Sequence, residues 1–396
     1  MQIFLFILGL LLFTSLVIVH EWGHFFVARR NGVKVEEFGL GLPPRAWGKK
    51  LKSGMMVSLN WLPIGGFVKL KGENDSDTRP GSFGAAPLST KTKIILAGVI
   101  MNLIAGVLLL TVLAWVGMPR LITKETVGQD QFTVASDTRV VHQDLIASYV
   151  QPDSPAEKIG LAPRDIILEV KSGDDARQIK SAPQLKAATQ DFAGQTVQLT
   201  YKHNNNQTTT KKVTLRSAAE VEASLNTDNP KGNLGVSPTE LQIRRSTWSA
   251  PVVALGFTEQ LFELTLKGLG NAFSGLGSLI AGAVTGNDQA RANGSSRATE
   301  QIGGPVAIGA ILWGSGTLGI LFVLMIIAII SLTLALINAL PIPALDGGRL
   351  SLILFSRLIL RRPLSRSVEE RIVGASMALI LGLLVLITIV DVRRFL

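Results

Sequence analysis

The chain has 396 residues, of which 47% are hydrophobic and only 17% are charged. Its mean hydropathy of +0.36 indicates a polytopic membrane protein that carries a soluble insert. The absence of cysteine excludes disulfides and cysteine-rich zinc sites. The net charge of +10 does not indicate nucleic-acid binding, because the basic residues crowd beside apolar segments, as is typical of membrane flanks. We therefore expect the lipid bilayer, and no nucleic acid, among the partners.

The first apolar segment, residues 1–19, carries no charge and is long enough to span a bilayer as a helix. It ends in the pentapeptide HEWGH. Residues four apart lie on one face of a helix, so His20 and His24 can bind one zinc ion while Glu21 stands beside it. This is the HExxH arrangement of metalloproteases, in which the glutamate takes a proton from zinc-bound water. The alternative, polar side chains reaching out of a helix end, is disfavoured because ionisable residues inside membranes are usually functional.

The basic loop that follows contains a strand-like pattern. Residues 56–61 and 67–71 lie on either side of the Pro-Ile-Gly-Gly sequence at 63–66, and their alternating polarity predicts a β-hairpin that turns at the two glycines. Two interpretations of this hairpin stay open: a surface element, or an edge that holds substrate by strand addition. On the second interpretation the contacts come from Gly65, Gly66, Phe67 and Val68.

Three further apolar segments, residues 94–118, 318–340 and 372–390, are each long enough to cross the hydrocarbon core. The loops after the first and third segments are rich in lysine and arginine, so the positive-inside rule places both loops in the cytoplasm and both chain ends outside. We expect no cleavable signal peptide, because no basic region precedes the first segment and HEWGH stands where a small-residue cleavage site belongs. We expect a multi-pass protein of the bacterial plasma (inner) membrane.

The long loop between the second and third segments is predicted to lie outside the cell and to hold one soluble domain at 125–245. Its pattern SPAxxxGLxxxDxIL, which starts at Ser154, resembles a PDZ domain, and PDZ domains bind extended peptides at a sheet edge. A small β-domain without a ligand is the alternative. At 249–304 an apolar stretch is interrupted by three charged residues spaced four apart, Glu259, Glu263 and Lys267, which predicts an interfacial amphipathic helix, followed by a flexible connector.

A catalytic zinc ion usually keeps three protein ligands and one open position. His142 and His203 belong to the outer domain, so no further histidine is available near the first segment. The third segment, however, leads into the sequence NALPIPALDGG at 338–348, and it crosses the membrane in the same direction as the first. Asp346 therefore reaches the same leaflet as HEWGH and is predicted to be the third ligand. The alternative is a loop carboxylate that pairs with Arg349.

Together these motifs make the chain resemble the site-2 protease family of intramembrane metalloproteases, in the bacterial branch that includes the regulator of sigma-E protease. The resemblance covers nearly the whole length: HExxH in the first segment, GGFVKL in the basic loop, AGVIMNLI in the second segment, the PDZ-like pattern, and NxxPxPxLDGG after the third segment. One departure is that members of this branch often carry two PDZ domains in tandem, whereas this loop has room for one clear copy.

The resemblance implies one zinc ion per chain, bound by His20, His24 and Asp346, with Glu21 as general base and general acid. It also implies that Asn338 contacts the substrate or the developing oxyanion. Irregular backbone at membrane depth is tolerated mainly where it lines a cavity, so the proline-broken segment that follows is a further candidate for substrate contacts. The residues concerned are Pro341 and Pro343.

Members of the family cut single-span membrane proteins, such as anti-sigma factors already trimmed by another protease, and some clear leftover signal peptides. The peptide carbonyls of a helix are hydrogen-bonded, so we expect the substrate to unwind and bind in an extended conformation. A peptide or protein ligand of the PDZ-like domain is expected as well. A non-catalytic scaffold and a zinc transporter are alternatives, but neither requires Glu21 beside the histidines.

The expected fold is a polytopic α-helical membrane protein with about four transmembrane helices, a cytoplasmic-side β-hairpin and an inserted extracytoplasmic PDZ-like domain. Residues 1–118 are expected to hold the first two helices and the hairpin, and 125–245 the PDZ-like domain. The amphipathic helix and connector follow at 249–304, and the last two helices with the NxxPxPxLDG motif at 305–396.

Overall fold

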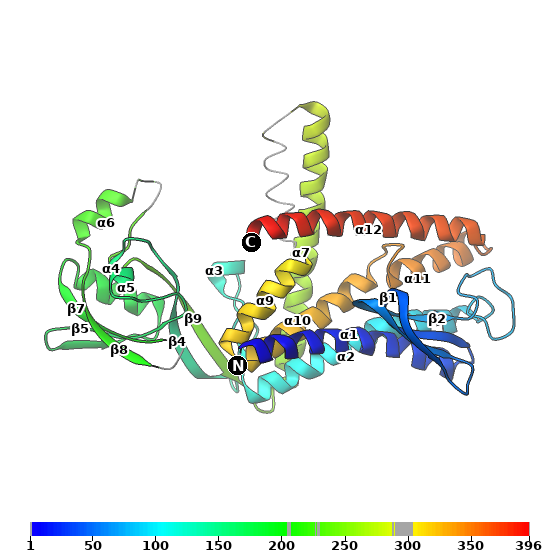
Figure 1. Ribbon diagram of the computed structural model, residues 1–396, viewed down its shortest axis with the longest axis horizontal. Coiled ribbons are helices and arrows are strands. Elements are labelled where there is room, and N and C mark those ends of the chain that lie inside the picture. Colours follow the sequence, from blue (N-terminus) through cyan, green and yellow to red (C-terminus); the bar gives the residue numbers. More distant parts are fainter. Residues whose placement is uncertain are drawn as a thin grey trace. The chain divides into compact units, whose positions relative to one another are not determined.

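The computed structural model describes residues 2–203, 207–225, 227, 230–286, 289 and 304–395. The chain forms two compact units (Figure 1). The first, here called the helical unit, comprises residues 1–116, 132–134 and 248–396. The second, here called the β unit, comprises residues 117–131 and 135–247. The metal-ligand candidates all belong to the helical unit.

Within the described residues, four helices are long and apolar enough to cross a membrane. They are α1 (Gln2–Arg30), α2 (Leu88–Val116), α10 (Ile320–Ala339) and α12 (Arg366–Phe395, of which Arg366–Ile389 is the candidate span). The expectation of about four transmembrane helices is confirmed. Helix α1 continues well past its apolar run, so the HEWGH sequence is helical, as the ligand spacing requires.

Helix α2 packs against both α1 and α10 (Figure 1). Small residues allow this close approach. A Cβ atom added at Gly23 of α1 would lie 2.6 Å from the Ala97 carbonyl oxygen, and one added at Gly106 of α2 would lie 2.6 Å from Leu332 Cγ. The three helices therefore form a tightly packed layer that positions the end of α1.

A sheet of two long strands, β1 (Val35–Lys50) and β2 (Met56–Leu70), follows α1. The chain turns between the strands at Leu51–Met55, where the Leu51 amide donates to the Met55 carbonyl at 2.8 Å. Residues 66–70 of β2 pair with 35–40 of β1. Residues 56–60 of β2 lie opposite both 37–40 and 45–50 of β1.

The prediction that Gly65 and Gly66 form the hairpin turn is wrong, because both belong to the continuous strand β2. Gly65 has a φ of 80°, a value that favours glycine, and it bends the strand without ending it. The alternating pattern on either side of the glycines is the same for a bend as for a turn, so the sequence does not separate the two. The glycines and prolines of β1 hid that strand from pattern analysis.

The remaining helices of this unit are α7 (Ala250–Thr285), α9 (Pro305–Leu318), α11 (Asp346–Leu354) and the π-helix η1 (Phe355–Ile359). In α7 the charged stripe of Glu259, Glu263 and Lys267 is exposed, and the helix ends at Gly286, whose φ is 69°. The predicted connector lies outside the described residues from 287 to 303, apart from 289. The short apolar helix α9 was not expected.

The β unit contains a sheet with the strand order β3-β9-β4-β5-β7-β8, in which β6 also pairs with β5. Its strands are β3 (Met118–Pro119), β4 (Arg139–Val150), β5 (Ile166–Ser172), β6 (Asp175–Gln178), β7 (Thr196–Lys202), β8 (Thr208–Thr214) and β9 (Val236–Arg245). Its helices are α3 (Lys124–Val127), α4 (Pro155–Lys158), α5 (Ala182–Asp191) and α6 (Ala218–Ser224). Leu145, Ile167, Leu199 and Tyr201 are fully buried in its core.

The SPAxxxGLxxxDxIL residues build the turn between β4 and β5. The Ser154 hydroxyl accepts a hydrogen bond from the Glu157 amide at 3.1 Å and so caps α4. Gly160 follows with a φ of 81°, and the Asp165 carboxylate accepts from the Ala162 amide at 2.9 Å. The PDZ-like character of this unit stays a prediction.

A buried ion cluster joins the loop after β2 to three helices. The Asp75 side chain is 1% exposed and pairs with Lys91 of α2 and, at 2.8 Å, with Nε of Arg357 in η1. The Asp75 amide donates to the Glu369 carboxylate of α12 at 3.2 Å. Burial opposes ionisation of Asp75, but the hydrogen bonds and charges of Arg357 and Lys91 hold the pKa of this carboxyl below its usual range.

We expect Asp75→Asn to lower the stability of the purified protein in detergent by about 3–5 kcal/mol, because it leaves the buried ammonium of Lys91 and the partly exposed guanidinium of Arg357 without their carboxylate. Thermal unfolding monitors the change. The matched control is Glu263→Gln, which breaks the exposed pair with Lys267 and should cost less than about 1 kcal/mol. Since the native pKa of Asp75 is lowered, its contribution should be complete above the ordinary carboxyl range and lost as pH falls through that native pKa. Equal effects of the two variants would contradict this account.

Candidate metal centre

The last turns of α1 place two imidazoles side by side. His20 and His24 are one helical turn apart, and their ring centroids lie 4.8 Å from each other in an edge-to-face arrangement. Their Nε2 atoms are 3.2 Å apart. Both rings therefore direct the same nitrogen to one point, which is the arrangement that the HEWGH spacing predicts.

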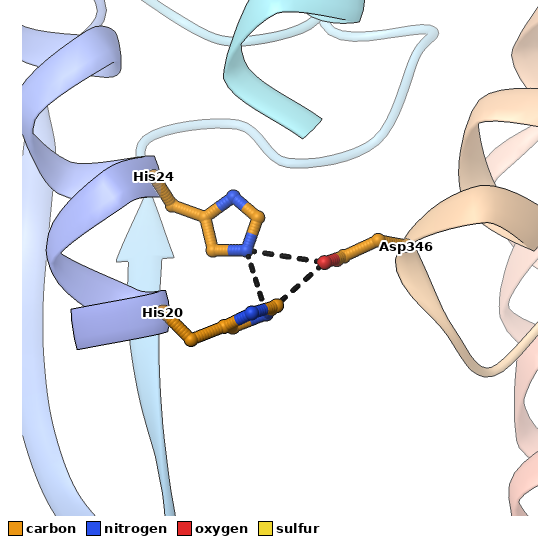
Figure 2. A group of neighbouring side chains, drawn as sticks. All are labelled: His20, His24 and Asp346. Atoms are coloured by element: carbon orange, nitrogen blue, oxygen red, sulfur yellow. Dashed lines mark hydrogen bonds and ion pairs between the residues drawn. The ribbon is translucent and has the colours of Figure 1, made fainter. Parts of the chain in front are cut away.

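Asp346 brings the third ligand atom from α11 to this point (Figure 2). Its Oδ2 atom lies 3.1 Å from His20 Nε2 and 3.3 Å from His24 Nε2. Oδ2 is buried and has no hydrogen-bond partner among the described residues. Tetrahedral zinc with ligand bonds of about 2.0–2.1 Å separates neighbouring ligand atoms by about 3.3–3.4 Å. The size of this triangle and its mixed imidazole–carboxylate composition thus fit a zinc ion with one position left open.

Two glycines make this position of Asp346 possible. Helix α10 ends at Ala339, and α11 begins at Asp346 after an irregular, proline-containing segment. A Cβ atom at Gly347 would lie 2.2 Å from the Ala339 carbonyl oxygen, and one at Gly348 would lie 1.9 Å from the Ile342 carbonyl oxygen. The Gly-Gly pair of the motif is therefore required for α11 to fold back onto the end of α10.

The orientation of α11 is also fixed by Arg349. Its Nη2 atom donates to the Glu73 carbonyl at 2.6 Å, and the guanidinium lies 4.9 Å from the centre of the Phe83 ring. The Glu73 carboxylate in turn accepts from the Leu70 amide at the end of β2, at 2.8 Å. Arg349 therefore connects the Asp346 helix to β2, and within the described residues it forms no ion pair with Asp346.

Helix α2 supports His24 from behind. The Nδ1 atom of His24 lies 2.8 Å from the Ile94 carbonyl oxygen. A carbonyl oxygen can only accept, so Nδ1 carries the proton and the lone pair of Nε2 is left for a metal. One turn further along α2, a Cβ atom at Gly98 would lie 2.4 Å from His24 Nε2 and 2.7 Å from His20 Cε1. Only glycine at position 98 therefore leaves enough space for both imidazole rings.

A cavity of about 380 Å³ opens beside the three ligand atoms. Glu21 lines it together with Phe67 and Val68 of β2. A Cβ atom at Gly66 would lie 3.3 Å from Glu21 Cγ, so β2 passes directly beside the carboxylate. The site thus combines a metal-ligand triangle, an adjacent carboxylate and a strand.

The structure brings most of the predicted site residues together. The cavity wall contains His20, Glu21, His24, Phe67, Val68 and Asp346. Among the described residues, Asn338, Pro341, Pro343, Gly65 and Gly66 are not part of that wall, although a Cβ atom added at Gly66 would lie 3.3 Å from Glu21 Cγ. Sequence analysis missed the contributions of Ile94, Gly98 and Arg349, and that of Asn102 in α2, whose side-chain amide lies 3.4 Å from His20 Nδ1. One signal was available, since a polar residue in the apolar segment at 94–118 needs a partner.

The sequence matches peptidase family M50 over residues 8–383. A Clostridium acetobutylicum protein named "Putative zinc metalloprotease" is 28% identical over 99% of this chain and 98% of its own length. A Clostridium perfringens protein of the same name is 28% identical over 98% of each chain. The "Probable protease eep" of Enterococcus faecalis is 23% identical, again over 98% of each chain.

We expect Gly98→Ala to weaken zinc binding at least about tenfold, because the new methyl group would displace both imidazoles. The control is Gly374→Ala in α12, where an added Cβ meets nothing within 4 Å. Zinc per chain is measured on the purified proteins during titration with a chelator. Wild-type zinc retention by Gly98→Ala would contradict the requirement for glycine behind the two rings.

Proposed function

This chain belongs to peptidase family M50, the site-2 protease family of membrane zinc metalloproteases, and we propose that it cleaves transmembrane segments of single-span membrane proteins. The observation that carries the proposal is the ligand triangle of His20, His24 and Asp346. Two of its members belong to a helix that is long and apolar enough to span the membrane. A metal site at that depth suits a peptide bond that lies within the bilayer.

Zinc held by His20, His24 and Asp346 would supply a Lewis acid for the hydrolysis of a peptide bond. Glu21 lines the cavity beside the ligand triangle. Its carboxylate accepts the proton of the attacking water and then delivers it to the nitrogen of the leaving amine. The Ile94 carbonyl accepts the Nδ1 proton of His24, so Nε2 of this ring would remain available to the metal. Asn338, at the end of α10, contacts the substrate or the developing oxyanion in this proposal.

Strand β2 is the proposed docking edge for the unwound substrate. Its residues 66–70 pair with β1 on one side, and the described residues provide no strand on the other. Backbone amides alternate in direction along a strand. The Leu70 amide points away from β1, to the Glu73 carboxylate, so those of Gly66 and Val68 also point away from β1, and the Val68 amide faces the Glu21 carboxylate. An extended peptide added there would run along the cavity beside Glu21.

The proposed setting is the bacterial plasma membrane, with the metal centre towards the cytoplasm. Its support is the excess of lysine and arginine in the loops after the first and third spans. Water then reaches the site from the cytoplasmic side. The β unit is extracytoplasmic in this proposal and acts as a PDZ-like selector that binds or excludes chain ends. Trimmed anti-sigma factors and leftover signal peptides are the proposed substrates.

Glu21→Gln should abolish cleavage, with a loss of at least about 10²–10⁴-fold, because the amide has the shape of the carboxylate but cannot accept the proton. A tagged single-span substrate is co-expressed with wild-type or variant protein, and the cleaved fragment is detected by immunoblot. Zinc content and thermal stability of the purified variant should match the wild type. Substantial cleavage by Glu21→Gln would overturn the assignment.

Val68→Pro should reduce cleavage at least about tenfold without changing zinc content, because proline removes an amide from the open edge. Val68→Ala is the matched control, since it trims the side chain at the same position and keeps the amide. Both variants are compared in the co-expression assay and by zinc analysis. Equal cleavage by the two variants would exclude strand addition at this edge.

A further inference from the structure

We propose that Asn102 is a positioning residue for the metal centre, and that its side-chain amide accepts the Nδ1 proton of His20 and so keeps His20 Nε2 free for zinc. The inference rests on the proposed zinc site and adds a residue to it. Asn102 lies on α2, among apolar neighbours of the span, and is 1% exposed. A buried amide in such surroundings is costly unless its polar atoms are hydrogen-bonded.

The contacts of this amide are half complete. Its Nδ2 atom lies 3.4 Å from His20 Nδ1. Its Oδ1 atom is buried and has no hydrogen-bond partner among the described residues. A half-turn of the amide group exchanges the two atoms, which places Oδ1 against His20 Nδ1. In that orientation the Oδ1 acceptor meets the nitrogen that needs one, and Nδ2 takes the place without a partner among the described residues.

The chemistry of the ligand triangle decides which atom of Asn102 faces His20. An imidazole that binds a metal through Nε2 carries its proton on Nδ1 and donates it to an acceptor. His24 meets this requirement with the Ile94 carbonyl at 2.8 Å. His20 presents Nε2 to the same triangle, at 3.1 Å from Asp346 Oδ2, so its Nδ1 proton needs the equivalent acceptor. Asn102 Oδ1 provides it.

The location of Asn102 supports this role. Ile94, Gly98 and Asn102 are four residues apart, so one face of α2 contacts both imidazoles. The Asn102 main chain is held as well, because Ser331 of α10 donates to its carbonyl at 2.8 Å. Helix α10 leads to Asp346. Asn102 is thus fixed between the helix that carries His20 and the helix that precedes the third ligand.

The two histidines are consequently held in different ways. His24 is oriented by the main-chain carbonyl of Ile94. A substitution at Ile94 changes only the side chain, so it removes this acceptor only if it also distorts the backbone. His20 is oriented by a side chain, so a point substitution can remove the acceptor and leave the helix intact. This difference makes the proposal testable by zinc binding alone, without reference to cleavage.

The experiment compares Asn102→Leu with Asn102→Asp in purified full-length protein. Leucine has a similar size but no acceptor, and aspartate keeps the acceptor. We expect Asn102→Leu to bind zinc about 10–100-fold more weakly in chelator competition, and Asn102→Asp to remain close to the wild type. The control is Thr111→Val, which removes another buried polar group of α2, one that bonds its own helix at Val107, and should change nothing.

A second readout reports the geometry directly. Cobalt replaces zinc in each protein, and its visible absorption bands should shift in Asn102→Leu but not in Asn102→Asp. Wild-type affinity and spectrum in Asn102→Leu would overturn the proposal, and equal losses in both variants would assign Asn102 to packing. His20→Ala separates this from the proposed function: if it loses zinc while Asn102→Leu does not, the zinc site stands and only the role of Asn102 falls.

Discussion

The arrangement depends on bringing two imidazoles and one carboxylate within 3.3 Å of each other inside an apolar helix layer. Such groups are costly to bury unless each polar atom has a partner, so the surrounding helices have to supply partners as well as space. Helix α2 does both along one face. Its carbonyl at Ile94 receives a proton, its Gly98 leaves room for the rings, and its Asn102 lies against His20. Helix α2, which lies between the ligand-bearing helices α1 and α11 in the sequence, therefore supplies the contacts from Ile94 and Asn102 that hold the two histidines.

The parts of this site that follow local rules were predictable from the sequence. The HEWGH spacing is set by the helical period, and Asp346 follows from the direction in which two spans cross the membrane. The bend in β2 was not predictable, because two adjacent glycines between alternating segments are equally compatible with a bend inside one strand and with a turn between two strands. Strand β1 was hidden by glycines and prolines that a paired strand tolerates here. The roles of Gly98 and Asn102 depend on which helix lies behind the imidazoles, and only the tertiary structure shows that.

Polar contacts hold the helices of the helical unit together at both ends of α12. Apolar packing gives little preference between helix and lipid, so such contacts decide how membrane helices are fastened. Helix α12 illustrates this, because no residue in its most apolar window is buried. It is fastened near one end by Glu369 to the Asp75 amide and near the other by Asp391, whose carboxylate accepts from the amides of Gly304 and Ala307.

His24 contacts a main-chain carbonyl and His20 contacts a side chain, and this difference determines which positions of α2 can vary in sequence. A main-chain carbonyl is present whatever the side chain, so position 94 is free to exchange one apolar residue for another without disturbing His24. Positions 98 and 102 have no such freedom, since one accepts no side chain and the other needs an acceptor of defined length. Neutral variation on this face of α2 is thus confined to position 94, and selection for zinc binding acts on position 98, which faces both rings, and on position 102, which faces His20.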